Sequence, residues 1–270
     1  MNDYPPPGQG TPSNAYQGPD GNINRGAPPV QPRMRIRPAG DPPYVVYTLM
    51  GITILMFLLQ QASSLFLNGT DLPAAMGMKV NELIIRGQLW RLFTPMLLHG
   101  SILHLGFNMY ALYIFGPGLE RIYGHVRFLA LFVLAGFAGN VFSFLFTDSP
   151  SLGSSTAIFG LLGAEAVFLY QNRRIYGAGG QRALINLVVI AVINLVIGLS
   201  PGIDNWGHVG GLLGGVLFAW YAGPVLRVEG VPPYHKLVDE RQKRDVWRAG
   251  ISIWLLFGLL AATTIFFNIR

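Results

Sequence analysis

Long apolar segments constrain the fold of this chain more than any other feature. Each is roughly 20 residues long and nearly free of charge, and a helix rising about 1.5 Å per residue crosses the ~30 Å of bilayer hydrocarbon over that length. A membrane barrel would need short strands of alternating polarity, whereas these segments are continuously apolar. The sequence therefore predicts an all-α polytopic membrane protein with spans at about residues 44–66, 100–118, 126–147, 153–171, 183–201, 206–224 and 248–267.

Composition excludes several other classes of protein. Charged residues make up 12% of the chain, about half of the ~25% usual in soluble domains. Lys and Arg outnumber Asp and Glu by 19 to 13, but the basic residues lie between the apolar segments, so they indicate orientation in a bilayer rather than nucleic-acid binding. Because the chain has no cysteine, it has no disulfide, no thiolate metal site and no cysteine nucleophile.

The chain divides into four regions. Residues 1–43 hold eleven of the nineteen prolines, and we expect a disordered cytoplasmic tail, with a proline-rich ligand for a partner domain as an alternative. The tail lacks the apolar stretch of a cleavable signal peptide. Residues 44–224 form the six-helix core, in which the loop 67–98 is expected to lie in the outer interface. Residues 225–247 are a charged cytoplasmic linker, expected to be a solvated helix, and 248–270 are a seventh span.

Basic residues predict the orientation of the spans. If the tail is cytoplasmic, 15 of the 19 Lys and Arg residues fall on the cytoplasmic side and 4 on the outer side. This bias places the N-terminus inside and the C-terminus outside. A plasma membrane, such as the bacterial inner membrane, is the default location, with membrane lipid as the surrounding partner. The second, fourth and sixth spans then begin at the outer face.

Polar side chains cluster at the outer ends of those three spans. Polar groups inside a bilayer are costly and need a specific reason. Singly, a serine caps a helix, a histidine packs in a core and an asparagine bridges helices. Together they supply a nucleophile, a base and neutral hydrogen-bond donors at one depth. The cluster consists of His99, His104 and Asn108, then Gly153-Ser154-Ser155-Thr156, then Trp206-Gly207-His208.

These residues carry motifs that resemble those of the rhomboid intramembrane serine proteases, over about residues 44–224. Trp90-Arg91 resembles the loop motif of that family, and Gly116 and Glu120 resemble the Gly and Glu at the inner side. The remaining motifs are HxxxxHxxxN at His99, His104 and Asn108, GxS at Gly153 and Ser155, and HxxGxxxG at His208, Gly211 and Gly215.

The resemblance implies a rhomboid-like six-helix bundle, extended here in a "six plus one" arrangement, that hydrolyses peptide bonds in transmembrane substrates. Ser155 would attack the scissile carbonyl, and His208 would take and return the proton. His104, Asn108 and the backbone N–H of Ser155 would form the oxyanion hole, while His99 would position the others. Neither a metal nor another cofactor is implied. Single-span proteins with a helix that is locally unstable near the outer face are the expected substrates, and the oligomeric state is not indicated.

Glycine spacing supports the same pairing from the residues themselves. Gly207, Gly211 and Gly215 recur every four residues, and Gly160 and Gly163 lie on the facing span. Helices that lack side chains along one face pack closely. Close approach is what a serine and a histidine on neighbouring helices need for a hydrogen bond. Gly153 would in addition leave the start of its helix open to a developing anion.

Five residues leave alternatives open. Thr156 stands where many members of the family have Gly, and its side chain either crowds the site or faces away. Ser154 is a rival nucleophile to Ser155. Asp204 is read as a loop residue rather than a third catalytic member. Glu165 is protonated or bonded to a neighbour such as Asn194, and Glu120 is a structural partner rather than a catalytic acid.

Other functions compete with the protease. HExxH and GxGD are absent, and the hydrolase motif GxSxG fails because Ala157 replaces its last Gly. A rhomboid-like pseudoenzyme would recognise transmembrane segments without cutting them, although such proteins typically lack the Ser or His that this chain retains. A transporter or channel would use Glu165 and the intramembrane asparagines as a polar path.

Overall fold

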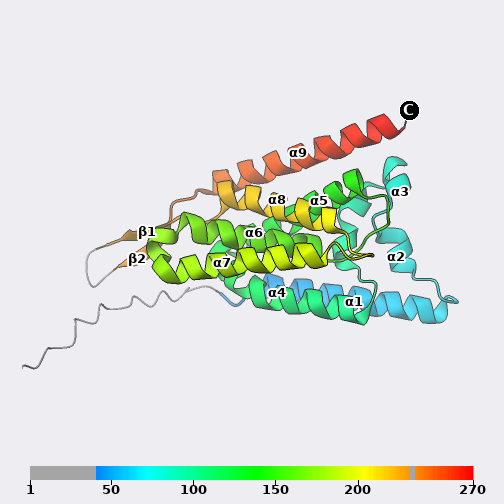
Figure 1. Cartoon of the computed structure of the whole chain (residues 1–270), viewed down its shortest axis with the longest axis horizontal. Coiled ribbons are helices and arrows are strands. Elements are labelled where there is room, and N and C mark those ends of the chain that lie inside the picture. Colours follow the sequence, from blue (N-terminus) through cyan, green and yellow to red (C-terminus); the bar gives the residue numbers. More distant parts are fainter. Residues whose placement is uncertain (1–40, 231–234, 270) are drawn as a thin grey trace, which may run out of the picture. The chain divides into compact units, whose positions relative to one another are not determined.

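The computed structural model describes residues 41–230 and 235–269, which belong to one compact unit. The predicted tail lies outside these residues except for its last three. Long helices dominate the described part (Figure 1): α1 (Tyr44–Phe66), α4 (Ile102–Tyr123), α5 (His125–Phe146), α6 (Ser155–Gln171), α7 (Arg173–Ile197), α8 (Asn205–Ala222) and α9 (Lys243–Asn268). Each matches one predicted span, so the all-α polytopic class is confirmed.

The spans differ in how apolar they are. Among the described residues, α1, α5, α7 and α9 are long and apolar enough to cross a membrane by length and composition, and α6 is a shorter apolar helix of 17 residues. The polar cluster lies at the start of α4, α6 and α8, and α8 is also rich in glycine. These features lower the mean hydropathy of the helices that carry the candidate site.

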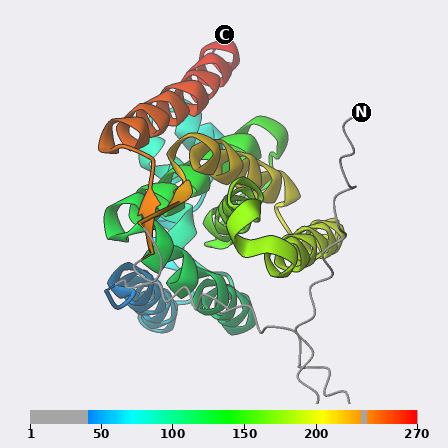
Figure 2. The same cartoon turned by 90° about the vertical axis from the view of Figure 1, so that its left-hand side faces the viewer.

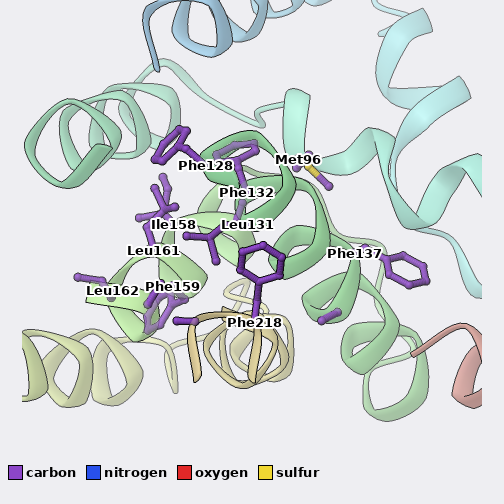
Figure 3. Packing of buried hydrophobic residues seen from close by; sticks show 14 of the residues in the cluster. Met96, Phe128, Leu131, Phe132, Phe137, Ile158, Phe159, Leu161, Leu162 and Phe218 are labelled. Atoms are coloured by element: carbon purple, nitrogen blue, oxygen red, sulfur yellow. The ribbon is translucent and has the colours of Figure 1, made fainter. Parts of the chain in front are cut away.

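The centre of the bundle is formed by α5, α6 and α8. In its most apolar window α5 is 67% buried, whereas α7 is only 11% buried, so α5 is a central helix and α7 a peripheral one. Figure 3 shows this region, where Phe128 and Phe132 of α5, Leu161 of α6 and Phe218 of α8 belong to one cluster of buried side chains. Figure 2 shows α9 at the edge of the bundle.

Large apolar side chains cover the outside of the bundle. Leu103 and Phe107 on α4 are more than two-thirds exposed, and so is Leu259 on α9. In water such a surface would be unfavourable, at about 25 cal/mol per Å² of apolar area. Lipid chains provide the apolar surroundings that these helices need.

Local signals explain where the helices begin and end. The Ser101 hydroxyl accepts from the backbone N–H of His104 and caps α4, and the Asp204 carboxylate accepts from Gly207 and caps α8. Gly124, at φ +77°, makes the turn between α4 and α5. Gly177, at φ +54°, kinks the first turns of α7, which explains why this helix begins ten residues before the predicted span.

The loop 67–98 contains several short helices. These are α2 (Leu72–Gly77), α3 (Asn81–Ile85), and the 3-10 turns η1 (Leu89–Leu92) and η2 (Thr94–Leu97). Their contacts with α1, α5 and α6 attach the loop to the end of the bundle at which α6 and α8 begin. The loop is therefore a folded element rather than a simple connection.

The linker differs from the prediction of a solvated helix, which is wrong. Strand β1 (Leu226–Glu229) pairs antiparallel with β2 (Lys236–Asp239), with Leu226 opposite Asp239. Gly230, Pro232 and Pro233 disfavour a helix here, while Val228 and Val238 favour extended backbone. The helix of the seventh span begins only at Lys243.

Candidate active site

A serine and a histidine meet where α6 and α8 begin. Ser155 is the first residue of α6, and His208 lies one turn into α8. The Nε2 atom of His208 and the Oγ atom of Ser155 are 2.9 Å apart, within hydrogen-bond distance. A neutral imidazole in this position accepts the hydroxyl proton, which is the arrangement of an activated serine nucleophile.

Glycines allow the two helices to approach so closely. A Cβ at Gly211 would overlap the carbonyl oxygen of Thr156, and one at Gly215 would overlap the backbone of Gly160. The glycine stripe predicted from the sequence therefore lies directly on the backbone of α6. A second stripe on α8 was not predicted: Gly214 faces α5, where an added Cβ would lie 2.6 Å from the Cβ of Ala138.

Among the described residues, no carboxylate forms a hydrogen bond with the second ring nitrogen of His208. Its Nδ1 atom is buried and has no hydrogen-bond partner among the described residues. Asp204 uses one carboxylate oxygen, Oδ1, to cap α8 through the N–H of Gly207, in agreement with its reading as a loop residue. Phe159 stacks on the imidazole, with 4.3 Å between ring centroids and 13° between planes. The ring is thus held by packing rather than by a carboxylate.

Ser154 belongs to a separate pair. Its Oγ atom lies 3.2 Å from Nε2 of His99, and both residues are almost completely buried. Burial, with a smaller contribution from His104, lowers the pKa of His99 to about 3, so its imidazole is neutral at physiological pH. Ser154 does not line the cleft that Ser155 lines, which makes it a poor nucleophile and a suitable anchor for the start of α6.

Gln60 of α1 fixes the position of His99 and was missed in the sequence. Its side-chain amide accepts from the backbone N–H of His99 at 3.0 Å and donates to the carbonyl of the same residue at 3.2 Å. It also donates to Asp71 at 2.8 Å. A glutamine in an otherwise apolar span was the available signal, because a polar group in a bilayer requires a partner.

A cleft of about 780 Å³ opens beside Ser155 and His208. His104 and Asn108 of α4, the two residues that the sequence resemblance assigns to the oxyanion hole, line this cleft. The Asn108 amide donates to the His104 carbonyl at 2.9 Å. A Cβ at Gly153, which has φ +135°, would lie 2.7 Å from Nε2 of His104, so glycine is required for the imidazole to sit against the chain just before Ser155.

The predicted loop residues organise the segment 67–98. The buried guanidinium of Arg91 donates to the carbonyls of Ala75 and Met78, each at 2.7 Å, and to the side chain of Gln88. The indole of Trp90 donates to the carbonyl of Met76 at 3.0 Å. Neither residue lines the cleft. They close the end of α2 by binding its free carbonyls.

Lys79 is a second residue that sequence reasoning missed. It is fully buried, and its ammonium donates to the carbonyls of Thr147 and Ser149 in the loop between α5 and α6. Its backbone N–H also donates to Ser151, at 2.9 Å. Burial lowers its pKa to about 8, which leaves it charged at neutral pH. Lys79 therefore ties the loop 67–98 to the segment that leads into Ser155.

Glu120 lies away from the cleft. Its carboxylate accepts from the backbone N–H groups of Val45 and Val46 at 2.9 and 2.8 Å, and Nδ1 of His125 lies 2.5 Å away. It thereby satisfies unpaired donors at the start of α1. The geometry agrees with the structural role expected from the sequence.

Thr156 and Glu165 are the two remaining residues whose roles the sequence left open. Thr156 is buried and faces Gly139 of α5 and Gly207 of α8, away from the cleft. Glu165 has a buried oxygen without a partner among the described residues. Of the two alternatives left open for Glu165, a bond to Asn194 is not found among the described residues: the Asn194 amide donates to the carbonyl of Ile190 on its own helix. Within the part of the chain that the structure describes, no cluster of His and acidic residues could hold a metal.

Comparisons with known proteins show the family of this chain. A family model described as the Rhomboid domain matches residues 86–225. Rhomboid protease GluP of Bacillus subtilis (strain 168) is 42% identical over 66% of this chain and 34% of its own length. RHOMBOID-like protein 9, chloroplastic, of Arabidopsis thaliana is 33% identical over 68% of this chain and 44% of its own. RHOMBOID-like protein 5 of the same plant is 35% identical over 73% of this chain and 68% of its own. The chain thus spans under half the length of the first two relatives.

Proposed function

The chain belongs to the rhomboid family, and from that premise we propose that it is an intramembrane serine endopeptidase acting through Ser155 and His208. The observation that carries this proposal is the 2.9 Å contact between Ser155 Oγ and His208 Nε2 at the wall of a cleft that His104 and Asn108 also line. A nucleophile, a base and neutral donors thereby share one space.

The reaction follows from these positions. Ser155 Oγ attacks the scissile carbonyl carbon while His208 Nε2 accepts its proton, and the same proton then passes to the leaving amine as the peptide bond breaks. Water, activated by His208 in turn, hydrolyses the acyl-serine. Because Nδ1 of His208 has no acidic partner among the described residues, the proposal assigns the chemistry to a dyad.

An oxyanion hole is proposed from three donors. Ser155 is the first residue of α6, so its backbone N–H has no partner within the helix. His104 and Asn108 face the same cleft from α4. Donors that are fixed in a site shielded from water stabilise the developing negative charge more strongly than they would in water.

The cleft also suggests how a substrate enters. Its walls include Phe107 and Phe115 of α4 and Ile190 and Ile197 of α7, and α7 is the least buried of the apolar spans. A transmembrane segment in the bilayer would reach Ser155 between these two helices. We propose single-span membrane proteins as substrates, with the site near the outer face of a plasma-type membrane and the N-terminus in the cytoplasm.

Labelling of the purified protein in detergent by a fluorophosphonate probe tests the proposal. The parent and the Ser154→Ala variant are expected to react, whereas Ser155→Ala and His208→Ala are expected to lose labelling. A folded parent that fails to react would favour the pseudoenzyme. Loss of labelling only in Ser154→Ala would mean that the nucleophile is the neighbouring serine.

A further inference from the structure

A second cavity, of about 430 Å³, lies between α8 and the first half of α9, far along the bundle from the beginnings of α6 and α8. Figure 1 shows α9 running beside α8, with the start of α9 at the end of α8. The catalytic proposal uses none of its residues. We call it the α8–α9 groove and define it by Leu217 and Tyr221 of α8 together with Arg241, Arg248, Ser252 and Leu256 from the region of α9.

Polarity changes along this groove. Arg248, Ser252 and Leu256 follow one another at intervals of four residues, so they lie on one face of α9, with Arg248 and Leu256 about 12 Å apart along the axis. Arg241 and Arg248 both line the polar end, and Leu217 and Leu256 line the apolar part. The 26 residues of α9 exceed what ~30 Å of hydrocarbon requires, so its first turns reach the headgroup level.

Two guanidinium groups at the polar end have unused donors. Arg241 donates to the carbonyl of Trp220 at 2.8 Å, but its Nε atom is buried without a hydrogen-bond partner in the described ranges. Arg248 is exposed and forms no hydrogen bond or ion pair with any described residue. Asp245 also lines the groove, although its carboxylate accepts from the backbone of Gln242 and lies 4.0 Å from Arg244. Positive charge therefore exceeds negative charge at this end.

We propose that the α8–α9 groove binds an anionic glycerophospholipid. The phosphate would accept hydrogen bonds from Arg241 and Arg248, whose planar groups suit phosphate oxygens. The glycerol would lie near Ser252, and an acyl chain would follow Leu256 and Leu217 into the hydrocarbon. Charge and polarity thus match such a lipid at both ends of the groove, and the lipid would join the seventh helix to the core.

Native mass spectrometry of the full chain tests this proposal. The protein is titrated with dioleoyl phosphatidylglycerol or dioleoyl phosphatidylcholine, and we expect one tightly bound phosphatidylglycerol. The Arg248→Gln variant should bind it about tenfold more weakly, the usual effect of losing one charge-assisted hydrogen bond. Lys243→Gln is the matched control, because it removes an equal charge from the start of α9 at a residue that does not line the groove, and it should bind as the parent does.

Three outcomes would overturn the proposal. Equal binding of phosphatidylglycerol and phosphatidylcholine would show that lipid charge has no role. An equal loss of phosphatidylglycerol affinity in Arg248→Gln and Lys243→Gln would show general attraction by surface charge rather than a specific lipid site. Displacement of phosphatidylglycerol by millimolar inorganic phosphate would show a simple anion site that needs no acyl chain. Unchanged fluorophosphonate labelling confirms that each variant is folded.

Discussion

At the scale of single residues, the two adjacent serines have different environments. Ser155 faces the cleft and His208, whereas Ser154 is buried against His99. The sequence supplied both candidates, and the GxS motif favoured Ser155. The sequence also predicted His208 as the partner of Ser155. It did not predict His99 as the partner of Ser154, because that pair depends on how the segment before α4 packs against the start of α6.

Thr156 is the residue whose role the sequence left most open. Its side chain lies against Gly139 and Gly207, and its buried hydroxyl has no partner among the residues described. An unpaired buried hydroxyl typically costs about 1–3 kcal/mol. We expect Thr156→Val, which keeps the shape, to raise the free energy of unfolding by about 1 kcal/mol and to leave fluorophosphonate labelling unchanged.

Denaturation of the purified protein measures this effect. Thr156→Ser serves as the control, because it keeps the hydroxyl and loses the methyl group, and it should destabilise the protein by about 1 kcal/mol. A Val variant that is less stable than the parent would show that the hydroxyl has a partner.

Gln60 connects α1 to the candidate site through the backbone of His99. Removing its amide leaves the backbone N–H and carbonyl of His99 without these partners, at a cost of about 1–3 kcal/mol. We expect Gln60→Leu to lower stability by that amount and to reduce the labelling rate of Ser155 about tenfold, because His99 supports the start of α6. Gln61→Leu, at the exposed neighbour, should change neither quantity. Equal effects of the two substitutions on denaturation and labelling would contradict this role.

At the scale of elements, continuous apolar segments predicted the spans well, whereas the structure of the connections was predicted poorly. Continuous apolar runs specify membrane helices without knowledge of their neighbours, so each of the long helices was foreseen. The linker formed the paired strands β1 and β2 instead of a helix. The reading of its charged residues as a solvated helix gave too little weight to Gly230, Pro232 and Pro233, which disfavour a helix. Lys79 was likewise missed, because its acceptors lie about seventy residues away.

The contact between α6 and α8 is the most sensitive element. A methyl group at Gly215 would overlap the backbone of Gly160, which cannot move aside as a side chain can. We expect Gly215→Ala to destabilise the protein by about 3 kcal/mol or more and to abolish labelling. Gly118→Ala is the matched control, because that helical glycine has open space around it and should be tolerated. If denaturation showed that Gly215→Ala is as stable as the parent, that result would contradict the observed packing.

At the scale of the whole molecule, the distribution of basic residues predicts orientation. Fifteen of the nineteen Lys and Arg residues lie on one side of the predicted spans. Because the chain has no cysteine, a single introduced cysteine is the only thiol in the protein. A thiol reagent then reports on which side of the membrane that residue lies. We expect Thr70→Cys to react with a membrane-impermeant maleimide in intact cells, and Lys236→Cys to react only after lysis. The reverse pattern would invert the topology and place Ser155 near the cytoplasm.

We propose that Ser155 cleaves transmembrane substrates. The most direct measurement is cleavage of a purified single-span protein, with a helix-destabilising segment near its outer face, by this chain in proteoliposomes. We expect a defined cut by the parent and by Ser154→Ala, and at least a thousandfold loss of cleavage in Ser155→Ala and His208→Ala. Cleavage that persists in Ser155→Ala at the parent rate would contradict it.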